Sequence, residues 1–441
     1  MQALQSIGKY SLLLLSLVLM HAGSSLAQSA PAASPKTNSP ALAPGTTIDA
    51  SNAGSYLQYL PAAAQAAINH GLKLQVVPTK RLDWSAGFTE ATEKYSSQVG
   101  LDAEDSITNY VAGAPFPTVA LSDPKAAVKI AYNWHMGPFM PDDFSLAPWG
   151  SFAYSNSGGD TIQPDEMDYI CEQFTFLRFA HRTEVDPRPT IGSNPQGLEW
   201  KARCNLWTAT AQGNAGEGSG IWVRFLDPHH GDEFYGFDSQ TRRVSRFGTS
   251  GPASETCRSC HQPYWAYALP KTEEYTYRVL GTAALLASLT ASDEPAGLME
   301  GGGNLKMSVE PSELRNAYIL EMTPKGLAQN LRSLVYIETE AYVWLAAEFF
   351  EGNERTATAI PLWRSHPSSS GGNLFDLAGE FYVPEQQSVM SYKPQNPGAA
   401  ATGRSPRWFF RTLRPPHSSF EQKINTGDVS EANFNPQFLS H

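Results

Sequence analysis

The sequence is poor in several features that would point to a defined activity. Charged residues make up only 17% of the 441 residues, and the formal net charge is −11 at pH 7. Because nucleic-acid binding depends on clustered Lys and Arg, this balance argues against a nucleic-acid partner. The chain also lacks a G-x-S-x-G elbow, an H-E-x-x-H helix, a phosphate loop and a dinucleotide fingerprint. No motif therefore supports a particular enzymatic reaction, and enzyme activity stays open.

No run of about 18 apolar residues is present that could cross a bilayer as a helix. The N-terminus carries a shorter apolar run, Tyr10 to Met20, after the single basic residue Lys9. Ser25-Leu26-Ala27 forms a small-x-small cleavage site, so residues 1–27 are predicted to be a cleavable signal peptide. In a bacterium the mature protein would then be periplasmic and not membrane-spanning, in a compartment where disulfides and covalent haem are both made.

The remaining chain divides by composition. Residues 28–47 form a Pro/Ala/Ser tract with too little apolar surface to fold, and they are predicted to be a disordered linker. Residues 48–395 are predicted to form one domain, with an insertion near 248–270. Residues 396–441 show little pattern beyond Trp408-Phe409-Phe410 and are predicted to be an irregular tail.

Helical periodicity occurs in two places. Apolar residues recur at helical spacing from Ser55 to Ile68, and Gly71 suits the position after a helix end. Asp123-Pro124 predicts a cap and first turn of a helix that continues to about Trp134.

Most other segments are rich in aromatic and β-branched residues and predict strands. The clearest are 221–226, 317–320, 334–337 and 342–345, whereas 297–303 and 365–372 are predicted to be loops. Short connections between strands favour antiparallel pairing in a strongly twisted sheet. The expected fold is therefore α+β, with a strongly curved antiparallel sheet packed on a few helices.

The segment Cys257-Arg258-Ser259-Cys260-His261 fits the C-x-x-C-H pattern that holds c-type haem. The two thiols can reach the two vinyl groups of one porphyrin, and His261 can supply an axial nitrogen to the iron. Met299, Met307 and His230 are candidates for the sixth ligand, and the sequence does not choose between them. The helical frame of a small cytochrome is missing around the motif.

The alternative is a local disulfide between Cys257 and Cys260, with His261 incidental. Cys171 and Cys204 lie on strand-like segments and are predicted to form a structural disulfide. A zinc site is disfavoured because four ligands at finger or ribbon spacing are absent. Thioredoxin-like exchange lacks its βαβ setting.

Other polar and aromatic residues are weaker candidates for a site. Residues 227–233 contain two histidines and three carboxylates but are predicted to be an exposed hairpin loop. The densest basic cluster is Arg242, Arg243 and Arg246, which could hold an anionic headgroup or pair with surface acids. Large aromatics, Trp222 and Trp344 among them, either fill a core or line a ligand cavity.

Four motifs together resemble the family known as domain of unknown function 1329. They are Gly113-Ala114-Pro115-Phe116-Pro117 before the Asp123-Pro124 helix, Phe234 to Asp238 followed by Thr241 to Arg246, Arg315 to Thr323, and Tyr336 to Tyr342. The resemblance covers Ile48 to Pro384. Glu338 and Tyr342 replace an Asp and a Trp of the family pattern, and the C-x-x-C-H motif is not a general feature of the family.

This resemblance implies the half-barrel of lipoprotein-sorting carriers, an antiparallel sheet curled around helices over an apolar cavity. It also implies an association with an inner-membrane exporter and an outer-membrane partner. The expected function is a periplasmic carrier for a hydrophobic, lipid-like ligand. The alternative is a c-type monohaem electron-transfer protein or a haem-dependent periplasmic oxidoreductase.

Overall fold

The computed structural model divides the chain into two compact units, Met1–Asn38 and Ser39–His441. All described residues belong to the second unit. Side chains are described for residues 42–139, 141–147, 173–205, 219–237, 242–246, 271–289, 309–326, 330–375, 381, 383, 423–436 and 439, and further strands are described by their backbone. The predicted signal peptide, most of the predicted linker and the C-x-x-C-H segment lie outside these residues.

The second unit is built mainly of β-strands, and 18 of them join in one sheet. The strands are β1 Thr47–Ile48, β2 Lys73–Val76, β3 Gly100–Leu101, β4 Ile107–Thr108, β5 Asp143–Ala147, β6 Trp149–Tyr154, β7 Thr161–Ile162, β8 Pro164–Cys171, β9 Phe174–Arg178, β10 Leu198–Ala209, β11 Gly216–Phe225, β12 Asp232–Asp238, β13 Arg243–Thr249, β14 Tyr275–Ala287, β15 Gly297–Met299, β16 Leu305–Met307, β17 Val309–Pro324, β18 Leu331–Glu338, β19 Trp344–Glu351, β20 Glu354–Pro367, β21 Asn373–Pro384, β22 Arg407–Phe410 and β23 Glu421–Ile424.

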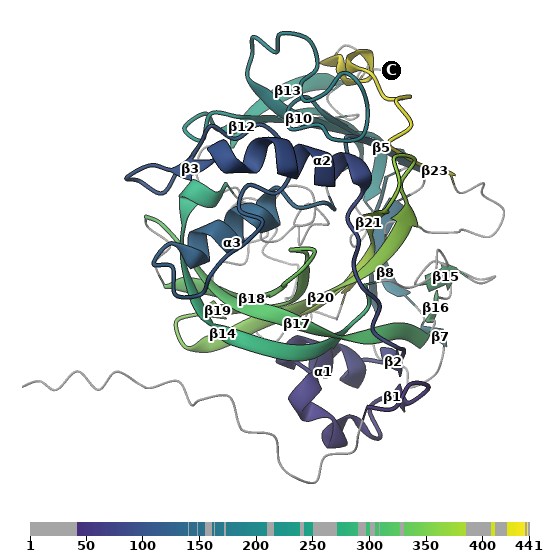
Figure 1. The fold of residues 1–441 in the computed structure, drawn as a ribbon. Helices are drawn as coiled ribbons and strands as arrows, with labels where there is room; N and C mark the ends of the chain where they lie inside the picture. The colour runs from purple at the N-terminus through teal and green to yellow at the C-terminus, as the bar shows by residue number, and fades with distance from the viewer. Residues whose placement is uncertain are drawn as a thin grey trace, which may run out of the picture. The chain divides into compact units, whose positions relative to one another are not determined.

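The large sheet is a long antiparallel ribbon that forks at β10. Its pairings run β13–β12–β11–β10–β8–β6–β22–β21–β20–β19–β18–β17–β14. The first half of β10 pairs instead with β9, which continues to β5 and β23. β2 pairs in parallel with the start of β17 and carries β1 at its side. Figure 1 shows the sheet curving around the helix α3.

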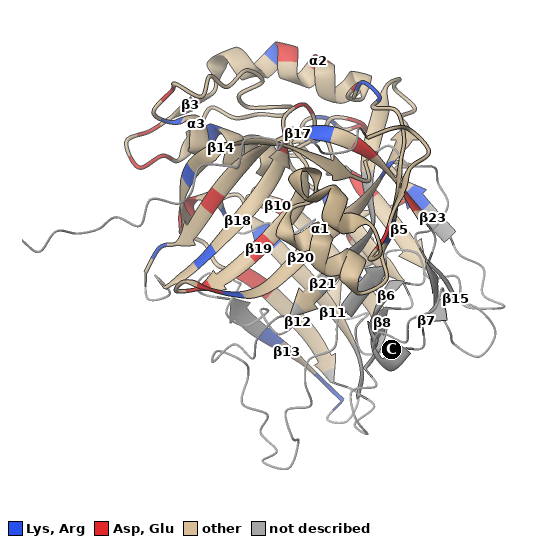
Figure 2. Cartoon of the chain, turned by 90° about the horizontal axis from the view of Figure 1, so that it is seen from below, with Lys and Arg blue, Asp and Glu red and all other residues tan. Residues whose placement is uncertain are grey.

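Three α-helices occur among the described residues: α1 Ala62–Asn69, α2 Ala86–Tyr95 and α3 Ala126–His135. α3 contacts β14 from within the curve, whereas α1 packs on β19, β20 and β21 from the other side. α1 has no charged residue, and Figure 2 shows it as a tan helix that lies across these strands. No helix in the described part of the chain has the length and hydrophobicity to cross a membrane.

The two faces of the sheet bury different hydrophobic clusters. The face toward α3, here called the inner face, joins Ile130, Ala131 and Trp134 of the helix to strand residues such as Phe176 and Val335. On the opposite, outer face, α1 and β2 cover the strands that contribute Leu362 and Phe381. A further outer cluster joins Leu177, Ile221 and Val223 to Val429, Phe434 and Leu439 near the C-terminus.

The predicted α+β class and the curved antiparallel sheet are confirmed in this coarse form. The helix predicted from Asp123 starts at Ala126, and the Asp123 carboxylate accepts a hydrogen bond from the Lys125 N–H. The helix predicted from Ser55 begins only at Ala62, because short 3-10 turns precede Pro61.

Several local predictions were wrong. The tail predicted to be irregular contains β22 and β23, and its last residues enter the outer cluster. β20 continues to Pro367, so the loop predicted over 365–372 is shorter, and β15 occupies the start of the loop predicted over 297–303. The strand predicted over 342–345 begins at Trp344, because Tyr342 adopts φ 54° in the turn before it.

Candidate functional site

The inner face carries two rows of side chains that cross five neighbouring strands. One row is Val279, Leu320, Val335, Ala347 and Ala359; the next is Tyr277, Met322, Ser333, Phe349 and Ala357. Paired residues of neighbouring strands point to the same side of a sheet, so each row forms a continuous stripe. All members but Ser333 are hydrophobic. We call these two stripes the inner rows.

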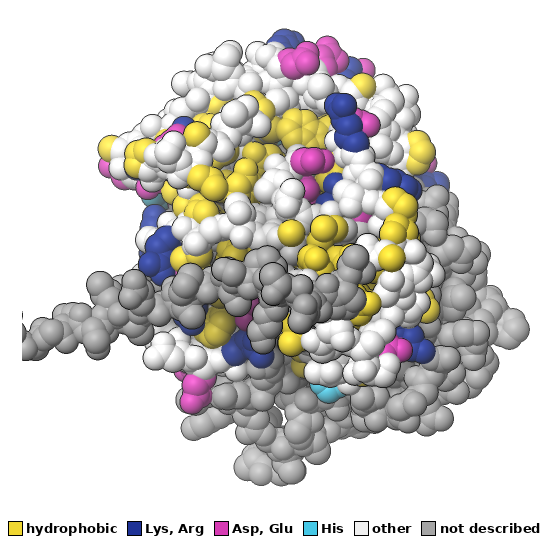
Figure 3. Space-filling view, turned by 60° about the horizontal axis from the view of Figure 1, so that its bottom comes forward, with side chains coloured by type: hydrophobic (Ala, Val, Ile, Leu, Met, Phe, Trp, Pro, Cys, Tyr) yellow, Lys and Arg dark blue, Asp and Glu magenta, His cyan; other side chains and the backbone are white. Residues whose placement is uncertain are grey.

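Part of this surface stays accessible. Tyr277, Val279 and Phe349 are only partly buried where they pack against the inner cluster, in contrast to Leu320 and Val335, which are fully buried. In Figure 3, hydrophobic side chains (yellow) appear in patches among polar ones on the described surface. Partly exposed aromatic and aliphatic groups next to a continuous apolar layer are suited to contact with an apolar ligand.

The other arm of the sheet adds aromatic side chains to the inner cluster. The Trp222 ring on β11 lies 4.8 Å from that of Phe234 on β12 and 6.5 Å from that of Phe174 on β9. Trp222 is partly buried against the inner cluster. The structure therefore places Trp222, one of the predicted ligand-binding residues, on the same face of the sheet as the inner rows.

Trp344, the other predicted ligand-binding tryptophan, is a core residue. It is 0% exposed, as is Trp363 on β20. The indole N–H of Trp363 donates a hydrogen bond of 2.7 Å to the main-chain oxygen of Trp344, and the Phe139 ring packs edge-on against Trp363 at 5.3 Å. These contacts fill the space beside α3 and give Trp344 a structural role.

The Gly113–Pro117 motif is held to α2 and α3 by buried polar contacts. Asn133 on α3 clamps the main chain of Phe116, accepting from its N–H at 2.9 Å and donating to its oxygen at 2.6 Å. The Ala114 N–H donates to the Thr92 hydroxyl on α2 at 2.8 Å. Gly113 has φ +83°, and a Cβ added there would lie 2.4 Å from the main-chain nitrogen of Thr92. The motif therefore links α2 to α3.

A buried charged cluster lies where α3 ends against β10. Glu199 is 3.5 Å from the imidazole of His135. Burial alone would raise the pKa of Glu199, but the hydrogen bond and charge of His135, together with the charge of Arg224, lower it to about 2. Burial lowers the pKa of His181 to about 4, so its ring is neutral at pH 7. The ring packs at a tilt against Tyr110, with the ring centroids 4.5 Å apart.

Arg224 is the neighbouring cation, and it is almost fully buried. Its guanidinium lies 5.0 Å over the Trp200 ring and donates two hydrogen bonds to the Asp232 carboxylate. Glu199 and Arg224 each have a nearby partner, so removing that partner would leave an uncompensated buried charge at the start of β10. It contains no assembled nucleophile and base, and among the described residues no group of three or more His, Cys, Asp or Glu is placed to hold a metal ion.

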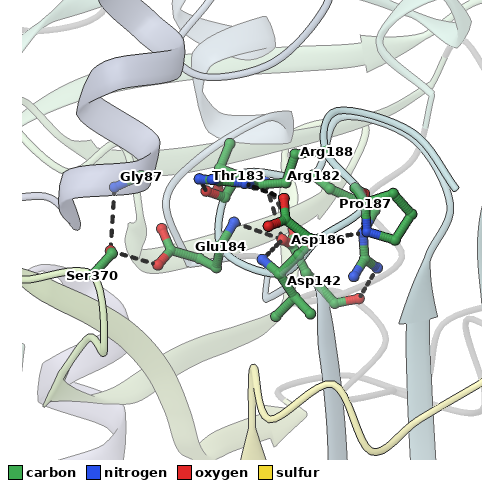
Figure 4. A network of polar contacts seen from close by, with 10 residues as sticks. Gly87, Asp142, Arg182, Thr183, Glu184, Asp186, Pro187, Arg188 and Ser370 are labelled. Atoms are coloured by element: carbon green, nitrogen blue, oxygen red, sulfur yellow. Dashed lines mark hydrogen bonds and ion pairs between the residues drawn. The ribbon is translucent and has the colours of Figure 1, made fainter.

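A second polar network, shown in Figure 4, ties together four separate parts of the chain. The buried Asp142 carboxylate accepts hydrogen bonds from the main-chain N–H groups of Thr183, Glu184 and Val185. The Glu184 carboxylate in turn accepts from three hydroxyls, those of Ser85 at the start of α2 and of Ser368 and Ser370 in the β20–β21 turn.

Glu338, at the end of β18, is a buried acid. Its carboxylate accepts main-chain N–H groups of Glu340 and Ala341 at 2.7 and 2.5 Å. Burial raises the pKa of Glu338 to about 7, although these two hydrogen bonds act to lower it. Glu338 is the residue that replaces an Asp in the family-like motif.

The structure separates the remaining predicted site residues. Arg246 pairs with Glu233, and Arg242 and Arg243 are exposed near the start of β13, which Figure 2 shows as a basic strand. Residues 227–231 form the predicted hairpin loop between β11 and β12, with both histidines exposed, but the prediction was wrong for Asp232 and Glu233, which belong to β12.

The cysteine predictions remain untested. Cys257, Cys260 and His261 lie outside the described residues. The backbone places Cys171 on β8 and Cys204 on β10, two strands that pair with each other, but the side chain of Cys171 is not described. The Cys171–Cys204 disulfide therefore stays a prediction.

The described part of the chain is a β-rich fold whose curved antiparallel sheet has a continuous apolar inner face. The sequence matches the family described as protein of unknown function DUF1329 over residues 47–364, and the chain belongs to this family. The resemblance drawn from the four motifs is thereby confirmed. No curated protein sequence matches the chain.

Solved structures with a similar chain path include three that share very little sequence. A DUF1329 family protein from Desulfovibrio piger is 12% identical, with a TM-score of 0.41 over 70% of this chain and 96% of its own. A putative outer membrane lipoprotein-sorting protein domain from Vibrio parahaemolyticus is 11% identical, with a TM-score of 0.39 over 71% and 98%. A LolA superfamily protein from Nitrosomonas europaea is 11% identical, with a TM-score of 0.31 over 71% and 99%.

Proposed function

We propose that this chain is an exported carrier that binds an apolar molecule, such as an acyl chain, on the inner face of its curved sheet. The observation that carries the proposal is the pair of inner rows, in which hydrophobic side chains cross five strands and Tyr277, Val279 and Phe349 remain partly accessible. The periplasmic location follows from the predicted signal peptide. The half-barrel enclosure and the exporter and outer-membrane partners follow from the family resemblance.

Apolar contact alone can supply useful affinity. Each methylene removed from water contributes about 0.8 kcal/mol, so eight buried methylenes contribute roughly 6 kcal/mol before the costs of association. A carrier must also release its ligand, and an affinity in the micromolar range would permit this. The face has few groups that could recognise a headgroup, so we expect selectivity for chain length rather than for headgroup chemistry.

Adjacent phenylalanines on β19 provide a matched test of the binding face. Phe349 lies in the inner rows, whereas Phe350 points to the outer face, where the Arg332 guanidinium lies 3.9 Å over its ring. We expect Phe349→Ser to weaken binding of the uncharged fluorophore N-phenyl-1-naphthylamine by about tenfold, because roughly 1.5 kcal/mol of apolar contact is lost. Phe350→Ser should leave the affinity near that of the wild type.

Both variants should first be shown to unfold in urea close to the wild-type midpoint. Competition by oleate that releases the fluorophore from the wild type would support an acyl-chain ligand. Lipid that co-purifies with the chain, detected by mass spectrometry after organic extraction, would support it independently. Equal loss of binding in Phe349→Ser and Phe350→Ser would contradict the assignment of the inner face.

The C-x-x-C-H motif favours a second candidate function, a haem-bearing redox protein in which Cys257 and Cys260 hold the porphyrin and His261 ligates the iron. This candidate rests on the sequence motif alone. Expression with the signal peptide in a host that has cytochrome c maturation machinery should give a red protein that stains for haem in a denaturing gel. A colourless chain whose intact mass shows no haem adduct would exclude this function, while a Cys257→Ala, Cys260→Ala variant serves as the control.

A further inference from the structure

A polar cavity of about 160 Å³ lies outside the inner face, between the outer side of the sheet and the C-terminal segment. Its floor comes from β5, β9, β10 and β23, and its wall includes Asp428, Val429 and Asn433. In Figure 1 this C-terminal segment (yellow) lies beside β5 and β10. The segment follows the family match, which ends at residue 364, so the matched region does not build this cavity alone.

The floor of the cavity is one row of four polar residues. Lys423 is the register partner of Ser145, Ser145 of Thr175, and Thr175 of Arg203. All four side chains therefore lie on one side of the sheet, with the two hydroxyls between the two cations. Since neighbouring strands are about 4.8 Å apart, the Cα atoms at the two ends of the row are roughly 14 Å apart. The flexible Lys and Arg side chains can converge from that separation on one small molecule.

Neighbouring amides hold this floor in place. Gln173 donates to the Ser145 hydroxyl at 3.0 Å, and Asn205 donates to the Gln173 side-chain oxygen at 2.7 Å. Thr175 is buried, and Arg203 is half-buried with its Nη1 donating to the main-chain oxygen of Asn433 at 2.7 Å. Ser145 and Arg203 are therefore held by contacts within the protein, and Thr175 is held by burial.

The charge balance of the lining is positive. Its ionisable members are Arg203, Lys423 and Asp428. Asp428 and Lys423 pair at 3.3 Å, but their side chains are 59% and 42% exposed, so water competes with this contact and the lysine can turn to another anion. Burial lowers the pKa of Arg203, so an incoming anion would offset the cost of keeping this guanidinium charged.

We infer that this cavity binds a small oxyanion, either a carboxylate or a phosphate group, between Arg203 and Lys423. The guanidinium supplies paired donors to two oxygens, the ammonium neutralises the remaining charge, and the Ser145 and Thr175 hydroxyls can donate to the oxygens between them. The cavity has room for inorganic phosphate or a short dicarboxylate but not for a lipid. The site is therefore separate from the proposed apolar ligand.

Calorimetric titration of the full exported chain tests the inference. Sodium phosphate and sodium succinate are each titrated at pH 7 in low salt, with sodium chloride at matched ionic strength as the reference. We expect saturable one-site binding of at least one oxyanion. Binding of phosphate alone assigns a phosphate group, and binding of succinate alone assigns a carboxylate.

Two substitutions locate the site. Arg203→Gln and Lys423→Gln should each weaken binding by about tenfold, the effect of losing one charge-assisted contact. Arg278 lies on β14, where its exposed side chain pairs with Glu321, so Arg278→Gln should bind the oxyanion as the wild type does. Lys423→Gln keeps the test valid if Arg203→Gln does not fold, because its partly exposed side chain contributes little to stability. Heats no larger than those of chloride, or wild-type affinity in Lys423→Gln and in any folded Arg203→Gln, would overturn the inference.

Discussion

The buried acid at the end of β18 should make the stability of this protein depend on pH. Burial raises the pKa of Glu338 from an ordinary value of 4.5 to about 7 in the folded chain. The folded state therefore holds a proton between pH 4.5 and 7 that the unfolded state has released, and the free energy of unfolding falls as pH rises through this window. Each pH unit in this window lowers the free energy of unfolding by about 1.36 kcal/mol, so the total loss is roughly 3 kcal/mol once the pH is above 7.

Glu338→Gln should remove this dependence. The Gln side-chain oxygen can still accept the N–H groups of Glu340 and Ala341 and carries no charge that must be buried. We expect the variant to be more stable than the wild type at pH 8, by up to about 3 kcal/mol, and similar in stability at pH 4.5. Glu354→Gln, at an exposed residue at the start of β20, serves as the control for loss of a carboxylate.

The measurement is urea-induced unfolding followed by tryptophan fluorescence at several pH values between 4.5 and 8.5. Taking the difference between variant and wild type at each pH cancels the titration of every other group that the substitution leaves undisturbed. A difference that is the same at pH 5 and pH 8 would refute the argument. So would destabilisation that grows with pH, because it would mean that the charged form of Glu338 is the one that the fold favours.

Three further substitutions test the contacts that hold the inner face in place, all measured by urea unfolding. Asp142→Ala should cost about 3 kcal/mol or more, because three main-chain N–H groups, one buried and two partly buried, lose their acceptor; a change below about 1 kcal/mol would contradict this. Gly113→Ala should destabilise by at least about 2 kcal/mol, whereas Gly54→Ala, where an added Cβ meets nothing within 4 Å, should not. Trp363→Phe should cost about 2 to 3 kcal/mol through lost volume and the lost hydrogen bond to the carbonyl of Trp344, and stability equal to the wild type would show that this hydrogen bond contributes nothing.

The sheet and α3 were predictable because their signals are local. Aromatic and β-branched runs indicate strands wherever they occur, and Asp123-Pro124 precedes by two residues a helix with a clear apolar side. α2 was missed because its ten residues, Ala86–Tyr95, are largely polar and show only a narrow apolar stripe. The docking of the last residues was missed because Val429, Phe434 and Leu439 follow no helical or strand period.

The polar networks could not be predicted, since each joins residues that are far apart in the sequence. Glu184 meets Ser85 and Ser368, which are 99 and 184 residues away. The elevated pKa of Glu338 depends on burial that three-dimensional packing alone creates. The Gly113–Pro117 motif was the only local clue in the sequence to the contacts that hold α2 and α3. Its role became clear from its contacts with Thr92 and Asn133.

The pairing of β23 with β5 has a consequence for the order in which the chain can fold. The Gly427 N–H donates to the Asp143 carboxylate across 284 residues of sequence, and β23 completes the side of the sheet that starts at β9. A polypeptide that emerges with its N-terminus first must leave β5 with an unoccupied edge until nearly all of it has been synthesised. Premature termination before residue 421 would leave the edge of β5 unpaired and expose Leu177, Ile221 and Val223 to water. Such truncated products should self-associate.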